Sequence, residues 1–133
     1  MATTTATITI NSTDLLTDEL SLSTSSTLTA AGSNTTGLAN TGGLARKTVV
    51  GAHGQYVLFD GDDYTAGSHK IYLKNLSTTA AEHFVIEINS EQMGKLYAGD
   101  WCFFPWEANA STNDIKIDPS ANDMVLEYML LSE

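Results

Sequence analysis

The chain has 133 residues, of which 16 are acidic and 6 are Lys or Arg, so its formal net charge is −10. A single cysteine excludes an intramolecular disulfide framework and a multi-cysteine zinc site. The acidic balance argues against a nucleic-acid partner, because phosphate contacts need clustered Lys and Arg. No apolar run approaches the ~18 residues of a membrane helix, so we expect no membrane partner. The first residues lack the basic and apolar regions of a signal peptide, and none is predicted.

The average composition hides a difference between the two halves of the chain. Residues 1–55 contain no aromatic residue, and residues 56–133 hold all 11 aromatic residues together with 13 acids against four lysines. Thr and Ser supply 20 of the first 48 residues, which leaves this part little apolar surface for a core. We therefore predict an extended Thr/Ser-rich N-terminal arm and linker over residues 1–50, followed by a β domain over residues 51–133.

The arm contains two stretches with the alternation of a β-strand. Thr alternates with Ala and Ile over residues 5–10, and Ser alternates with Leu over residues 20–23. We expect the arm to become ordered by adding strands to a sheet, either its own or a neighbour's. The alternative is that these stretches are two ordinary edge strands of the same domain. Residues 13–22 are the only weak helix candidate, and residues 34–43 indicate a loop.

The second part of the chain predicts about seven short strands separated by turn residues. The expected strands are 56–59, 69–76, 82–89, 93–97, 101–104, 115–117 and 123–131. Alternation places Met124, Leu126, Tyr128 and Leu130 on one face of the last strand. Seven strands at this spacing predict an all-β fold, either an antiparallel β-sandwich or a small jelly-roll-like barrel. The strand order cannot be deduced from the pattern.

Residues capable of chemistry are scattered. His69 and His83 begin two expected strands and could be cross-strand neighbours in a metal site. The more common case is that a histidine at the start of a strand is solvated. The pattern around His53 indicates a loop. Cys102 lies between bulky apolar neighbours, which favours a buried hydrophobe over a reactive thiolate. The run of residues 60–63, Asp-Gly-Asp-Asp, lacks the ligand spacing of a calcium loop and reads as a turn. We expect no catalytic residue, no metal, no cofactor and no enzymatic activity.

The most distinctive segment is residues 96–106, which contains five of the 11 aromatic residues. Alternation places Trp101 and Phe103 on one face and Cys102 and Phe104 on the other. This is more apolar surface than a half-exposed strand needs, and it indicates a two-sided core or a binding patch. The residues that we expect at an interface are Ile8, Ile10, Leu20, Leu22, Tyr97, Trp101, Phe104 and Trp106.

Three segments together resemble a family of small virion structural proteins of tailed phages, especially marine cyanophages. They are the Thr/Ser-rich opening at residues 1–10, the stretch Ile-Tyr-Leu-Lys-Asn-Leu-Ser-Thr at residues 71–78, and the stretch from Gly94 through Pro105-Trp106, with the closing strand Val-Leu-Glu-Tyr at residues 125–128. The resemblance covers most of the chain, and its motifs are structural. It implies a β-sandwich virion component without enzymatic activity, and it brings no catalytic residue.

The resemblance leads to an expected function. We expect a capsid decoration or cement protein of a bacteriophage that is assembled in the host cytoplasm and located in the virion. Its expected partners are the major capsid protein or another virion protein, and copies of itself in a homo-oligomer, with a trimer as one option. A tail or baseplate component is the first alternative. A carbohydrate-binding β module, with Tyr97 and Trp106 as a stacking platform, is an alternative of another class.

Overall fold

The computed structural model describes residues 4–15, 17–28, 38, 40–50, 54–109 and 112–132, and its regular elements are almost all β-strands. The strands are β1 (Thr5–Ser12), β2 (Leu20–Thr27), β3 (Asn40–Thr41), β4 (Ala45–Val49), β5 (Tyr56–Phe59), β6 (Gly67–Asn75), β7 (His83–Ile88), β8 (Glu91–Tyr97), β9 (Trp101–Ala108), β10 (Ile115–Pro119) and β11 (Met124–Ser132), with one 3-10 turn, η2 (Gly61–Asp63). All the strand pairs are antiparallel, which confirms the all-β expectation.

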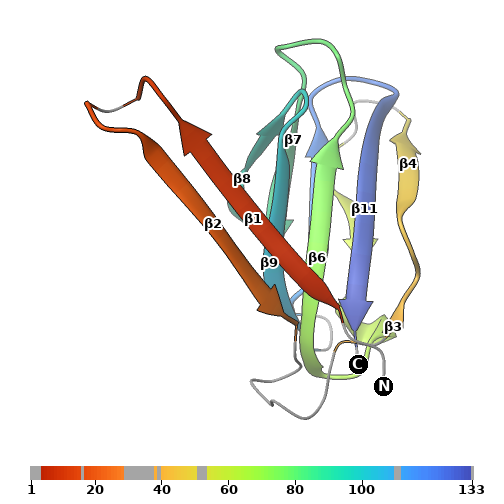
Figure 1. Cartoon of the computed structure of the whole chain (residues 1–133). Helices are drawn as coiled ribbons and strands as arrows, with labels where there is room; N and C mark the ends of the chain where they lie inside the picture. Colours follow the sequence, from red (N-terminus) through yellow and green to blue (C-terminus); the bar gives the residue numbers. More distant parts are fainter. Residues whose placement is uncertain are drawn as a thin grey trace.

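In the described part of the chain, nine strands form a two-sheet sandwich, and eight of them, β4 to β11, have the connections of a jelly roll (Figure 1). One sheet has the order β3-β11-β6-β9 with β4 also paired to β11, and the facing sheet has the order β5-β10-β7-β8. The antiparallel partners are nested along the chain: β4 pairs with β11, β5 with β10, β6 with β9, and β7 with β8. This nesting is what results when one long hairpin of paired strands is rolled into two sheets, and it defines the jelly-roll form of the sandwich.

The core lies between the two sheets and receives side chains from all eight of these strands. The inward residues follow the period of two that the sequence shows, because alternate strand residues point to opposite faces. The fully buried members include Ile71 and Leu73 of β6, Phe84 of β7, and Ile115 and Ile117 of β10. The predicted inward face of β11 is confirmed: Met124 and Leu126 are core residues, and Tyr128 and Leu130 pack against them.

Turn residues close the hairpins between these strands. Asn89 and Ser90 join β7 to β8 with φ of 51° and 63°, the combination that a two-residue type I′ turn requires. Gly99, with φ of 83°, allows the tight turn from β8 to β9. Asp60 caps the 3-10 turn by accepting a hydrogen bond from the N–H of Asp62 at 3.0 Å, so this acidic run is a turn, as expected.

The N-terminal part departs from the expected division of the chain. The boundary at residue 50 is too late, because β4 at Ala45–Val49 is already a strand of the sandwich and pairs with β11. β1 and β2 pair with each other as a separate two-stranded sheet. The weak helix candidate at residues 13–22 is wrong, since its described residues form the loop of this hairpin and the start of β2.

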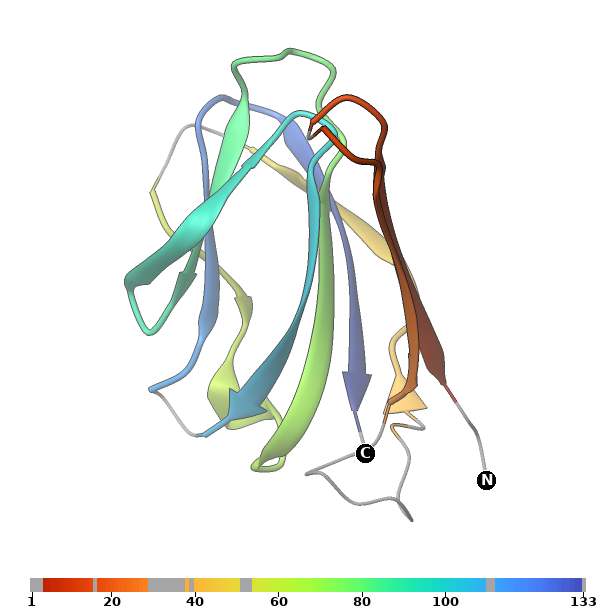
Figure 2. The same cartoon turned by 60° about the vertical axis from the view of Figure 1, so that its left-hand side comes forward.

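The β1–β2 hairpin lies along the outer side of the sheet that contains β6, β9 and β11, on the opposite side from β7 and β8 (Figure 2). Its base is fixed by a second, small apolar cluster in which Leu28, Leu38 and Leu131 are buried and Ala6, Phe103 and Met129 pack around them. The N–H of Leu28 donates to the carbonyl of Thr4 at 2.8 Å, and the hydroxyl of Thr4 donates to the carbonyl of Leu38 at 3.1 Å.

Candidate interaction surface

The β1–β2 hairpin has one hydroxyl-bearing face. Thr5, Thr7 and Thr9 of β1 lie opposite Thr27, Ser25 and Ser23 of β2 in the strand register. The Thr7 and Ser25 hydroxyls are hydrogen bonded, and those of Thr9 and Ser23 are 3.4 Å apart. This face is exposed, and its side-chain hydrogen bonds run between the two strands of the hairpin. Its hydroxyl groups therefore favour solubility and do not attach the hairpin to the sandwich.

The opposite face of the hairpin holds its apolar side chains beside Ser12, Thr24 and Ser26, and it is only partly covered. Ala6, at its base, packs on the sandwich, and Ile8 and Leu20 are half-buried. Ile10 and Leu22 are cross-strand partners, and they are 50% and 47% exposed. A cross-strand pair of large aliphatic side chains is a favourable contact that this hairpin leaves half in water. The outer half of this face is therefore the surface that a partner would bury.

The two long edges of the hairpin have no strand partner among the described residues. Neither β1 nor β2 contains a charged residue or a proline. Natural edge strands are usually protected by such residues, because an open edge recruits other strands. The unprotected edges fit a segment that pairs with another chain.

The aromatic segment is divided between the core and the surface. Trp106 is only 3% exposed, packs with Phe59 and Tyr64, and donates its indole N–H to the carbonyl of Asn113 at 2.7 Å. Phe104 also packs against the core. Both residues were expected at an interface; the structure buries Trp106 and leaves Phe104 half-buried against the core. Trp101 is 53% exposed and Tyr97 is 45% exposed, so these two are accessible.

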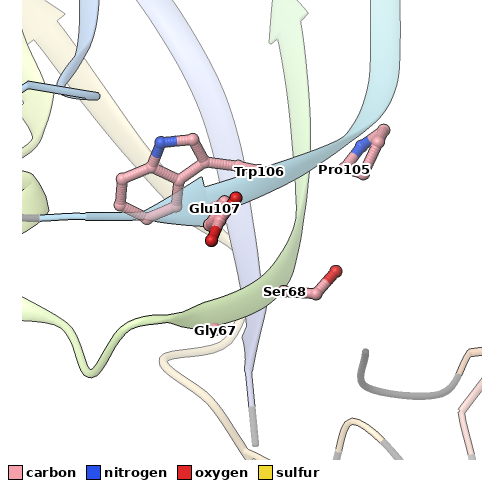
Figure 3. Close-up of a pocket in the computed structure, with 5 residues that line it drawn as sticks. All are labelled: Gly67, Ser68, Pro105, Trp106 and Glu107. Carbon is pink, nitrogen blue, oxygen red and sulfur yellow. The ribbon is translucent and has the colours of Figure 1, made fainter. Parts of the chain in front are cut away.

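The burial of Trp106 follows from the length of β9. The strand was expected to end at Pro105, but β9 continues to Ala108, so the alternation runs on and Trp106 points inward like Phe104. β9 is at the edge of its sheet, where a missing N–H is tolerated. Figure 3 shows a shallow hollow on β6 and β9, lined by Gly67, Ser68, Pro105, Trp106 and Glu107, with the Trp106 indole directed to the opposite side of β9 from Pro105.

The remaining candidates for chemistry are separated in the fold. His69 and His83 are not cross-strand neighbours, because His69 lies opposite Trp106 in β9 and His83 lies opposite Tyr97 in β8. The third histidine, His53, lies outside the described residues. Within those residues no group of three or more His, Cys, Asp or Glu side chains is placed to hold a metal ion. Burial raises the pKa of the Cys102 thiol to about 11, which makes it a poor nucleophile at neutral pH.

No family model, no curated protein and no solved structure matches this chain. Among the described residues, no helix is long and apolar enough to span a membrane.

Sequence reasoning missed the contacts that hold the hairpin base. Leu28 and Leu38 are isolated leucines in a Thr-, Ala- and Gly-rich region, and nothing in the local pattern links them to Leu131. It also missed that the two central segments of the resemblance meet in space: the N–H of Asn75 donates to the carbonyl of Asp100 at 3.0 Å. Both are contacts between distant parts of the chain, which periodicity does not encode.

Proposed function

We propose that the protein is a structural component of a phage virion, a capsid decoration or cement protein that binds the assembled shell through its N-terminal hairpin. The observation that carries this proposal is the β1–β2 hairpin, which combines two open, unprotected edges with an apolar face that is half exposed at Ile10 and Leu22.

The physical argument concerns the stability of the hairpin. An isolated two-stranded sheet is only marginally stable in water. Stability requires three or more strands, or packing of one face against another element. Here only the base of the hairpin packs on the sandwich. A neighbouring virion protein that adds a strand to β1 or β2, or covers the apolar face, would supply what is missing. The jelly roll is a fold that viral capsid domains share with lectins, so it is compatible with this role without deciding it.

The net charge agrees with a position on the outside of a particle. A charge of −10 disfavours contact with packaged DNA and keeps the free protein soluble before assembly. The exposed hydroxyls of β1 and β2 have the same effect on solubility. The expected partner is therefore the outer surface of the shell, formed by the major capsid protein.

Binding to particles tests the proposal. Phage heads stripped of this protein are mixed with the full chain, with a chain lacking residues 1–27, or with the variant Ile10→Ser/Leu22→Ser, and bound protein is measured after sedimentation. We expect the full chain to bind and both altered chains to lose binding while circular dichroism still reports a folded β domain. Binding of the truncated chain at the full level would overturn the role of the hairpin.

The two alternatives make different predictions. A tail or baseplate component would use the same hairpin but would co-purify with tails and not with heads. A carbohydrate-binding module needs an exposed aromatic platform, and of its two proposed rings only Tyr97 is accessible. Binding of the full chain to a glycan array, with loss in Tyr97→Ala, would favour that alternative over the virion role.

A further inference from the structure

A cavity of about 490 Å³ opens at the end of the sandwich where β3 pairs with the last residues of β11 (Figure 1). Its walls are formed by residues 40–43, by Phe59 and Tyr64, and by the final part of β11. It adjoins a second hollow of about 300 Å³, with which it shares Tyr64 and Ser132. Ligand cavities of proteins typically have volumes of about 300–1,000 Å³, so this one is large enough to hold a small molecule.

Three aromatic rings line this cavity, and we call Phe59, Tyr64 and Tyr128 the aromatic cage. Tyr64 and Tyr128 both pack against Phe59, with ring centroids 6.1 and 5.7 Å away and interplanar angles of 76° and 79°. The two tyrosine rings thus stand almost perpendicular to the Phe59 ring, so rings of different orientation border the same space. Proteins use aromatic cages to bind quaternary and methylated ammonium groups, because the ring faces attract a cation electrostatically.

The charges around the aromatic cage favour a positive ligand. Among the described residues, the single cation–π contact joins the Lys47 ammonium to Tyr56, which does not line the cavity. Asp63 is the only Asp, Glu, Lys or Arg among the described residues that line the cavity or the adjoining hollow. Burial, with a contribution from the Asp63 carboxylate, raises the pKa of Tyr64. The cage therefore combines uncharged rings with one nearby negative charge, and the described lining residues include no Lys or Arg that would repel a cation.

We propose that this cavity binds an alkylammonium head group, with the cation against the aromatic cage and close to Asp63. A rounded ammonium group can contact several rings at once, whereas an anion would be repelled by the Asp63 carboxylate and by the net charge of −10. The head group can belong to a small molecule or to a lysine side chain of another protein. Leu130 lines the cavity, whereas Leu131, the next residue, is buried at the hairpin base, so the site is separate from the surface through which we propose that the protein attaches.

Backbone-amide NMR of the full-length protein measures the binding. The protein is titrated with choline chloride, with the uncharged alcohol in which carbon replaces the nitrogen of choline, and with NaCl at the same ionic strength. We expect saturable shifts of the Gly42 and Gly43 amide signals with choline, and a dissociation constant at least about tenfold lower than that of the alcohol, because only the cation is attracted to the rings and the carboxylate. A titration with a blocked lysine amide distinguishes the sources: affinity equal to that of choline indicates a partner's side chain, and lower affinity indicates a small quaternary ammonium compound.

Substitutions in the cavity separate ring electrostatics from shape. Tyr128→Leu keeps an apolar side chain but removes the ring, and should weaken choline binding by about tenfold, whereas Tyr128→Phe keeps the ring and should bind choline like the wild type. Asp63→Asn, at an exposed position, should weaken the binding of choline and leave that of the alcohol unchanged. The matched control is Tyr97→Leu, which removes an exposed tyrosine on β8 and should have no effect.

Three results would each overturn the proposal. They are the absence of saturable shifts with choline, equal affinities for choline and the alcohol, and a choline affinity that is unchanged in both Tyr128→Leu and Asp63→Asn. Because Asp63 is exposed, its variant tests the site independently of the packing around Tyr128. None of these results bears on the attachment of the hairpin to the shell, since the two sites are on opposite faces of β11.

Discussion

Asn75 and Asp100 are joined through their backbones at the end of the sandwich where β6 ends and β9 begins. The N–H of Asn75 donates to the carbonyl of Asp100 at 3.0 Å, and the N–H of the adjacent Gly99 donates to the carbonyl of Asn75 at 3.1 Å. These residues belong to the two central segments on which the resemblance to phage virion proteins depends. These hydrogen bonds give the two segments a structural role, because they connect the end of β6 to the turn before β9.

The side chain of Asn75 adds further hydrogen bonds at this point, and we expect their loss to destabilise the fold. It is fully buried, donates to the carbonyls of Leu96 at 3.0 Å and Glu82 at 3.3 Å, and accepts from the N–H of Ser77 at 2.9 Å. Asn75→Asp keeps the shape but removes the donors, so we expect it to lower the free energy of unfolding in urea by about 2–3 kcal/mol. An equal stability of Asn75→Asp and wild type would contradict this role, and Thr78→Ala, at an exposed neighbouring position, is the control.

Gly99 is expected to matter through its backbone angle alone. An added Cβ would meet nothing within 4 Å, but its φ of 83° lies in the left-handed region. Gly99→Ala should therefore cost about 1–2 kcal/mol of stability by thermal unfolding. Gly94→Ala, in β8, is the matched control, since that glycine is equally uncrowded and has no positive φ. If both alanine variants melt at the same temperature, the strain argument fails.

The ion pair on the outer sheet face links a mostly exposed cation to a buried anion. Arg46 Nε donates to Glu127 Oε2 at 2.9 Å, and the Tyr72 hydroxyl donates to Glu127 Oε1 at 3.3 Å; the side-chain exposures of Arg46 and Glu127 are 66% and 10%. Arg46→Met leaves the carboxylate with one partner, and we expect a loss of about 1 kcal/mol, limited by the exposure of the arginine.

A double-mutant cycle with Glu127→Gln isolates the contribution of this pair. The glutamine keeps the shape but not the charge, so Arg46→Met should cost less in the Glu127→Gln background than in the wild type. Strictly additive effects in urea denaturation would show that the pair contributes nothing.

Stability is expected to fall at alkaline pH. Burial raises the pKa of Cys102 from its usual 9.0 to about 11. Burial also raises the pKa of Tyr64, with a contribution from Asp63, and that of Tyr72, with a contribution from Glu127. The unfolded chain therefore releases these protons at lower pH than the folded one, so the stabilisation is complete below about pH 9 and is lost as the pH rises through 11.

Urea denaturation as a function of pH measures this effect. The free energy of unfolding should decline from about pH 9 in the wild type. In Cys102→Ala the decline should begin only where the tyrosines titrate. Identical pH profiles for the two proteins would contradict the burial of the thiol.

The two tryptophans should report opposite environments. Trp106 is enclosed and hydrogen bonded, whereas Trp101 is more than half exposed. In Trp106→Phe, fluorescence comes from Trp101 and should be quenched readily by iodide; in Trp101→Phe it comes from Trp106 and should resist quenching. The first variant should also lose about 2 kcal/mol or more of stability, because a large core side chain is shortened. Equal quenching of both variants would contradict the assignment of faces.

The strands and their faces were largely predictable, and their pairing was not. In β6, β7 and β11 the alternation of large apolar residues with polar ones is regular, and such a pattern fixes which side chains face the core. In β4 the sequence Ala-Arg-Lys-Thr-Val has only one buried residue, Val49. Its pattern therefore does not predict a strand, which becomes evident only from its pairing with β11. The nested order of the jelly roll joins strands up to about 80 positions apart, as Arg46 and Glu127 show.

The residues expected at an interface differ in how far the structure exposes them. Of the residues expected at an interface, the exposed ones are Ile10, Leu22, Tyr97 and Trp101, and the half-buried ones are Ile8, Leu20 and Phe104. Trp106 is buried, because β9 continues through Pro105 and keeps its alternation. A strand that is longer than expected continues its alternation, so a strand end placed at Pro105 left the inward direction of Trp106 unpredicted.

A reconstruction of the phage particle at side-chain resolution tests the central claim most directly. We expect density for the jelly roll on the outer surface of the head, with the β1–β2 hairpin in contact with the shell. Density for this protein in which the hairpin projects freely into solvent, or purified heads and tails that lack the protein altogether, would contradict it.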